Sequence, residues 1–142
     1  MSAILSRLPR HGVSFSLVCR TAADAAALQG IRDARAVLPL SVARGTSFDA
    51  AWFPWNGMRF DLEVPSALTI HDLFAIEEPH RNLVARFREQ RPILHGARKA
   101  KAIATVSHWS AGRIASRFAM PAGMVSVIPP ILETFWQPVP KK

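Results

Sequence analysis

Short apolar runs that alternate with helical segments are the feature that most constrains the fold of this chain. Six such runs are predicted to be strands: residues 15–19, 36–40, 49–53, 66–70, 102–106 and 124–128. A run that is continuously apolar is typical of a strand buried on both faces, as in a parallel sheet covered by helices. The fold class predicted is therefore α/β, with a Rossmann-like, mostly parallel sheet and helices on both of its faces.

One domain is expected, because 142 residues of which 49% are apolar suffice for a single packed core. We expect residues 15–138 to form this partial Rossmann-like domain. An irregular segment at 1–14 is expected before it and a short tail at 139–142 after it.

The longest predicted helix covers residues 80–99 and is strongly basic. Pro92 lies inside it and is predicted to kink the helix or to divide it in two, because proline lacks a backbone donor. Several apolar residues recur at helical spacing and are expected to form the face toward the core. They are Leu83, Val84, Phe87, Leu94 and Ala97.

Two further helices are predicted. Thr21 and Asp24 resemble a capping box for a helix that runs to about Gln29. Ser107 is expected to cap the second helix. The inner face of that second helix is predicted to consist of Ala111, Ile114, Ala115 and Phe118.

Charge is concentrated in one part of the chain. Residues 81–117 hold nine basic side chains and one acid, Glu89, so their surplus equals the net charge of +8 of the whole chain. A basic surface attracts phosphates, in nucleic acid, in anionic lipid headgroups or in a substrate. A plain solvated helix surface explains the same charge, because charge alone identifies no partner.

Cysteine usage and targeting signals favour a cytoplasmic location. Cys19 is the single cysteine, so it forms no internal disulfide, and we interpret it as a small buried residue at a strand end. No signal peptide or membrane-spanning run is recognised. The histidines follow no HxH or HExxH spacing, so neither a metal site nor any other cofactor is expected.

Polar and aromatic residues follow the predicted strands, where ligands of open α/β sheets bind. The residues concerned are Asn56 and Gly57 after one strand, His71 and Asp72 after the next, and Ser107, His108 and Trp109 after a third. Each has a simpler alternative. His71 could be a core-edge histidine bonded to a backbone carbonyl, Ser107 a helix cap, and Asn56 and Gly57 a turn. Trp52, Trp55 and Trp109 could stack on a sugar, but partial burial in the core is the simpler expectation.

The order of these strand ends resembles the N-terminal, acceptor-side domain of retaining GT-B glycosyltransferases of the group 1 type (family four). The likeness rests on His71-Asp72, Val106-Ser107 with Ser110, Ile128-Pro129, and Phe135 with Pro138, and it covers roughly residues 48–138. It implies a parent enzyme that transfers a sugar from a nucleotide-sugar donor to a glycan or lipid-linked acceptor. The resemblance places His71 and Asp72 at the catalytic cleft, with Asp72 orienting its neighbours, and Asn56, Gly57, Ser107 and Trp109 near substrate.

The sequence departs from that family in two ways. Residues 1–12 hold one glycine and no strand pattern, whereas the family begins with a strand and a glycine-rich loop. The donor-binding domain of the family, with its basic pair and Glu-x7-Glu motif, has no counterpart here. We therefore expect an incomplete half of a GT-B fold that is inactive as an isolated chain and depends on a donor-domain polypeptide.

Two other functions stay open at this point. The chain could be a degenerate domain kept as a binding or regulatory module. It could also be a small basic nucleic-acid-binding protein, although residues 81–117 contain no recognised binding motif. A peripheral contact between the basic helix and an anionic membrane, at its inner face, is compatible with the glycosyltransferase interpretation.

Overall fold

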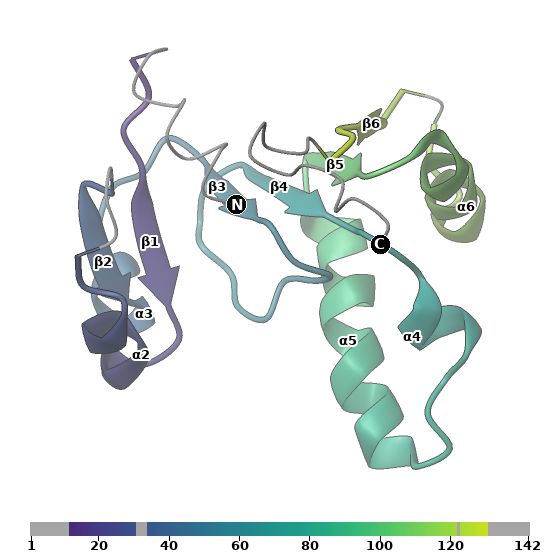
Figure 1. Cartoon of the computed structure of the whole chain (residues 1–142), viewed down its shortest axis with the longest axis horizontal. Coiled ribbons are helices and arrows are strands. Elements are labelled where there is room, and N and C mark those ends of the chain that lie inside the picture. The colour runs from purple at the N-terminus through teal and green to yellow at the C-terminus, as the bar shows by residue number, and fades with distance from the viewer. Residues whose placement is uncertain (1–11, 31–33, 122, 131–142) are drawn as a thin grey trace, which may run out of the picture. The chain divides into compact units, whose positions relative to one another are not determined.

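The computed structural model describes residues 12–30, 34–121 and 123–130. The described residues up to Ser47 belong to one compact unit and those from Phe48 onward to a second unit. Both units are α/β with parallel strands, so the predicted fold class is confirmed (Figure 1). The expectations for residues 1–11 and 131–142, including Phe135 and Pro138, lie outside the described residues.

The first unit is a pair of parallel strands with two short helices. Strand β1 (Ser16–Cys19) pairs with β2 (Ala36–Pro39), with Val18 opposite Leu38. Helix α2 (Ala22–Ala27) connects them, and its N-terminus carries the predicted capping box between Thr21 and Asp24. Helix α3 (Leu40–Ala43) follows β2 directly, so the predicted strand 36–40 ends one residue early.

The second unit contains a four-stranded parallel sheet in the order β3-β4-β5-β6 (Figure 1). Its strands are β3 (Ala51–Phe53), β4 (Ser66–Thr69), β5 (Ala102–Thr105) and β6 (Val125–Val127). The register places Phe53 beside Leu68 and Leu68 beside Ile103, so these three side chains lie on one face. On the opposite face, Trp52 Nε1–H donates to Thr69 Oγ1 at 2.9 Å.

Three helices accompany this sheet: α4 (Phe74–Glu77), α5 (Leu83–Lys99) and α6 (His108–Phe118). Ile93 and Ala97 of α5 and Ile114 of α6 join Leu68 and Ile103 in one hydrophobic core. Helices α5 and α6 therefore cover the face that carries Leu68. The predicted inner face of α6 is confirmed: Ile114 is fully buried, and Ala111, Ala115 and Phe118 are half-buried.

The prediction for the inner face of α5 is wrong. Leu83, Val84 and Phe87 are exposed, Leu94 is half-buried, and Ala97 alone of the predicted set is buried. The buried residues of this helix are Pro92, Ile93, Gly96 and Ala97. The packed face is the one that approaches β4 closely, where a Cβ on Gly96 would lie 2.6 Å from Leu68 Cδ2 and 3.2 Å from Met58 N, whereas Leu83, Val84 and Phe87 belong to the first turns of the helix.

Pro92 neither ends nor divides α5, which is one continuous helix of 17 residues. The helix begins three residues later than predicted, where the Asn82 side chain accepts hydrogen bonds from the backbone of Val84 and Ala85. The carbonyl of Pro92 accepts a hydrogen bond from Met58 N–H at 2.9 Å. Buried Pro92 thus connects α5 to the loop after β3.

Candidate functional site

Asn56 connects the loop after β3 to the loop after β4. Its Oδ1 accepts from the backbone N–H of His71 at 2.6 Å, and its Nδ2 donates to Asp72 Oδ2 at 3.2 Å. Three of the predicted site residues are therefore brought together. Because β3 and β4 are parallel neighbours, this contact lies at the carboxyl edge of the sheet, where α/β folds bind ligands.

The ring of His71 is held between a backbone carbonyl and an indole. His71 Nε2 lies 3.0 Å from Pro54 O, and the ring centroids of His71 and Trp55 are 5.4 Å apart. A carbonyl oxygen can only accept, so Nε2 carries the proton and donates. Neutral His71 therefore presents Nδ1 as a hydrogen-bond acceptor, and Nδ1 makes no hydrogen bond to the described residues.

The contact with Pro54 engages one of the two ring nitrogens of His71. The backbone carbonyl expected for a core-edge histidine is present, yet the ring stays half-exposed next to an exposed tryptophan. A neutral imidazole with Nε2–H bonded to Pro54 has only an acceptor, Nδ1, left for any other group. Only the imidazolium would donate to a ligand as well as to Pro54.

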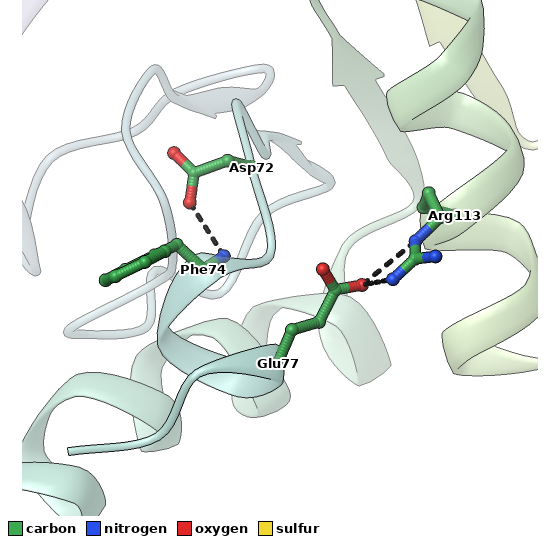
Figure 2. A network of polar contacts seen from close by, with 4 residues as sticks. All are labelled: Asp72, Phe74, Glu77 and Arg113. Atoms are coloured by element: carbon green, nitrogen blue, oxygen red, sulfur yellow. Dashed lines mark hydrogen bonds and ion pairs between the residues drawn. The ribbon is translucent and has the colours of Figure 1, made fainter.

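Asp72 orients its neighbours, as the resemblance implied. Its Oδ1 accepts from the backbone N–H of Phe74 at 2.9 Å and so holds the start of α4, as Figure 2 shows. Its Oδ2 accepts from Asn56. With both carboxylate oxygens engaged in positioning two loops, Asp72 is placed as an organising group of this edge.

The N-terminus of α6 contributes the next part of the edge. Ser107 Oγ accepts from the backbone N–H of Ser110 at 3.1 Å, so Ser107 is the predicted N-cap. Trp109 follows and is 71% exposed. A small crevice lies beside this tryptophan, and its lining consists of Asp72, Leu73, Glu77, Trp109, Ser110, Arg113 and Ile114. Asp72 and Trp109 thus meet at one crevice, whereas Ser107 does not line it.

An ion pair connects α4 to α6 at the same crevice. Arg113 donates to Glu77 Oε1 from Nε at 3.0 Å and from Nη2 at 2.5 Å (Figure 2). The Arg113 guanidinium carbon also lies 5.4 Å from the centre of the Trp109 ring. The pair is partly solvated, so its main effect is to hold the Trp109 side of the crevice in place.

Gly57 has a structural role in the loop after β3, and its predicted contact with substrate stays a prediction. Its φ is +113°, and a Cβ there would lie 2.6 Å from the carbonyl carbon of Pro92 and 2.8 Å from Ile93 N. Glycine is therefore required at this position so that the loop can approach α5. The backbone bends at residues 55–57, in the loop for which the sequence suggested a turn.

Two tryptophans are much more exposed than the sequence suggested. Trp55 is 74% exposed and Trp109 is 71% exposed, so the expectation of partial burial is wrong for both. Trp52 is 39% exposed and is held by Thr69. Sequence reasoning also missed Glu77 and Arg113, which are 36 residues apart. Their proximity could have been expected from one feature, because Glu77 and Arg113 lie on helices that follow adjacent parallel strands.

The one resolved pKa shift lies outside this edge, and the described residues offer no metal site. Burial, with a smaller contribution from Asp24, raises the pKa of the Cys19 thiol, which lies in the first unit and is buried as predicted. The described residues contain no group of three or more His, Cys, Asp or Glu side chains that could hold a metal ion. None of their helices is both long and apolar enough to cross a membrane.

Comparison of the chain with protein-family models, with curated proteins and with solved structures found no match in any of the three. Arguments about function therefore rest on the geometry of the edge. That geometry offers one imidazole acceptor, two exposed indoles and a set of carboxylate and amide groups that are already occupied with each other. Stacking on an indole and hydrogen bonding to an imidazole nitrogen are the interactions that these groups can offer to a ligand.

Proposed function

We propose that the edge formed by Asn56, His71 and Asp72, with Trp55 and Trp109, is the sugar-binding surface of an acceptor-side glycosyltransferase domain. The order of the strand-end motifs supports this proposal, as does the parallel α/β fold that carries them. The observation that carries most weight is the pairing of an acceptor that makes no hydrogen bond to the described residues, His71 Nδ1, with the exposed indole of Trp55.

The chemistry of a hexose matches this pair. A pyranose ring has an apolar face of C–H groups and a rim of hydroxyls, so it stacks on an indole and hydrogen-bonds at its edge. Trp55 supplies the stacking surface and His71 Nδ1 accepts from a hydroxyl. Asn56 keeps both loops in register, because it bonds to His71 and Asp72 at once.

The reaction class proposed is transfer of a sugar from a nucleotide-sugar to a glycan or lipid-linked acceptor. Rate in such a reaction depends on holding donor and acceptor from both sides of a cleft. The residues described here supply one side, and their role is to position the acceptor. We expect the 142-residue chain alone to bind sugar weakly and to transfer none.

A titration of the isotopically labelled chain with glucose, mannose and a nucleotide-hexose, followed by amide and indole NMR signals, tests this proposal. We expect the signals of Trp55 and His71 to shift at millimolar sugar concentrations, because binding should be weak, with a Kd of about 1–10 mM. Trp55→Ala is expected to weaken binding by at least about tenfold, because it removes the stacking surface.

The matched control is Phe87→Ala, which removes an exposed aromatic residue from α5, away from the edge. It should leave sugar affinity unchanged. The proposal would be refuted if the signals of Trp55 and His71 did not shift at a sugar concentration about 50-fold above the upper limit of that Kd range. Binding that survives without any transfer, even when a donor-domain polypeptide is added, would instead identify a pure binding module.

A further inference from the structure

Helix α5 presents large apolar side chains to solvent at its N-terminal end. Leu83 is 72% exposed, Val84 is 78% exposed and Phe87 is 63% exposed. All three belong to the first turns of the helix, which extend away from the strands of their own unit in Figure 1. A group of exposed apolar neighbours usually marks an interaction site. Burial of this group needs a partner, because Ile93 and Ala97 already occupy the face of α5 that packs on the core.

A row of residues continues from this apolar end along the outward side of the helix. Residues 84, 87, 91, 94 and 98 recur at spacings of three and four, so they lie on one side of α5. The row extends over roughly 21 Å, or about four helical turns. A groove of about 320 Å³ lies along it, and the described lining of the groove is Phe87, Gln90, Arg91, Leu94, His95 and Arg98. The row is therefore apolar at its start and basic farther along.

The arginines of this row have no acidic partner among the described residues. Arg91 and Arg98 are exposed, and neither forms an ion pair within the part of the chain that the structure describes. Asp61 is engaged by the lining residue His95, whose Nε2 lies 2.8 Å from its Oδ1. The Arg91 guanidinium carbon lies 5.6 Å from the centre of the Phe87 ring. A partner that covers this ring must therefore also satisfy the neighbouring cation.

We propose that this row of α5 is the docking surface for an acidic amphipathic helix of a partner protein. The apolar side of the partner helix packs on Leu83, Val84 and Phe87, in the manner of helices that bind in grooves. Its carboxylates pair with Arg91 and Arg98, and such charge-assisted bonds are the stronger ones. Residues 81–117 carry a surplus of +8, so an acidic partner is also attracted before contact.

Other occupants fit this face less well. A bilayer that buries Phe87 in hydrocarbon also takes the Arg91 guanidinium out of water, and hydrocarbon offers that cation no acceptor. Nucleic acid pairs with the arginines but leaves Leu83 and Val84 in water. A second copy of the chain offers no described helix with more than one acid. An acidic amphipathic helix satisfies the apolar and the charged residues together.

This docking surface shares no residue with the sugar-binding edge, so the two proposals can fail separately. The edge is formed by the loops after β3 and β4 and by α6, whereas docking uses α5. Loss of docking with sugar binding intact would overturn only the docking proposal. Loss of sugar binding with docking intact would overturn only the proposed function.

Fluorescence anisotropy of a labelled peptide mixed with the full chain tests the docking proposal. The peptide is about 18 residues long, enough to span the row, with leucines at helical spacing on one side and glutamates beside them. One control peptide has the same composition with its leucines scattered around the helix, and another has lysines in place of the glutamates.

The acidic amphipathic peptide is expected to bind with a Kd of about 1–10 µM, at least about tenfold more tightly than either control peptide. Equal affinity for this peptide and for either control would overturn the proposal. Absence of binding by the acidic amphipathic peptide at about 100 µM would overturn it as well.

Two double variants separate the apolar from the charged contribution. Leu83→Gln with Phe87→Gln should weaken peptide binding at least about tenfold, because the apolar contact is lost. Arg91→Gln with Arg98→Gln should weaken it at least about fivefold and reduce its dependence on salt. The four side chains are exposed and glutamine preserves helix propensity, so circular dichroism should show folded protein in both cases.

The matched control is Val42→Gln with Arg44→Gln, which removes an exposed apolar residue and an exposed arginine from the first unit. It should bind the peptide like the unaltered chain. If Leu83→Gln with Phe87→Gln leaves peptide affinity unchanged, the row is not the docking surface and the proposal is overturned. Loss of vesicle binding or of self-association in that variant, with peptide affinity unchanged, would identify a bilayer or a second copy as the occupant instead.

Discussion

The two long sides of α5 carry opposite kinds of apolar residue. The side toward the sheet holds Gly96, Ala97 and Ile93, and the side toward solvent holds Leu83, Val84 and Phe87. Size alone does not separate the two sides, because buried Ile93 is as large as Leu83 and larger than Val84, but the glycine and the alanine lie on the inner side. The inner side approaches the sheet closely, since a Cβ on Gly96 would lie 2.6 Å from Leu68 Cδ2.

Apolar periodicity identifies a stripe along a helix but does not specify what covers that stripe. The stripe that includes Leu83 and Phe87 has a helical period, which predicts a face packed on the core. The residues that do pack include a proline, a glycine and an alanine, which are weaker indicators of a buried helix face than leucine or phenylalanine. Gly57 belongs to the same inner contact, since its loop lies against Pro92 and Ile93.

The largest expected effect comes from Gly57→Ala. The added methyl would collide with the backbone of Pro92 and Ile93, which cannot move without shifting α5, and alanine at φ +113° is strained. Steric and conformational terms together predict a loss of about 4 kcal/mol in the free energy of unfolding. Urea denaturation followed by circular dichroism at 222 nm measures it.

Gly112→Ala is the control for this substitution. Gly112 lies inside α6 with nothing within 4 Å of an added Cβ, so alanine should leave stability unchanged or raise it by about 1 kcal/mol. Equal stability of the two variants would mean that the loop after β3 does not pack on α5 as described.

Truncation on the inner side is expected to have the next largest effect. Ile93 is 2% exposed and belongs to the core cluster, so Ile93→Ala should lower the free energy of unfolding by about 3 kcal/mol. The same urea titration measures it as a lower transition midpoint. A loss below about 1 kcal/mol would show that this side of α5 is not the packed one.

Truncation on the outer side is expected to have the smallest effect. Phe87→Ala and Leu83→Ala remove side chains that are mostly in water, and each should change the free energy of unfolding by no more than about 0.5 kcal/mol. The midpoints of both variants should overlap that of the unaltered chain in matched urea titrations. A cost at Phe87 equal to that at Ile93 would remove the distinction between the two sides.

Much of the fold could be predicted from the sequence because it depends on local patterns. All six described strands fall inside the predicted runs, and Thr21 and Ser107 cap the helices that follow them. The helices α3 and α4 were missed because each has only four residues, too few to show a period. Pro92 lies within one continuous helix and its carbonyl accepts from Met58 N–H, a tertiary contact that no local pattern specifies.

The site was less predictable, because its contacts join residues far apart in the chain. Asn56, His71 and Asp72 were predicted as site residues because each follows a strand. The Asn56 side chain joins them through its hydrogen bonds to His71 and Asp72. The tautomer of His71 is set by the carbonyl of Pro54, 17 residues earlier, which no local pattern specifies. The exposure of Trp55 likewise depends on where the loop after β3 lies, and residue type alone favours burial.

The order of strands in the second unit, β3-β4-β5-β6, is also their order along the chain. Each strand therefore adds to an edge that synthesis has already produced, and no strand has to insert between two existing ones. A nascent chain that has reached Thr105 holds three of the four strands and α5. Assembly of this sheet can follow translation from one edge to the other, so a ribosome that delivers the chain N-terminus first delivers its parts in the order in which they pair.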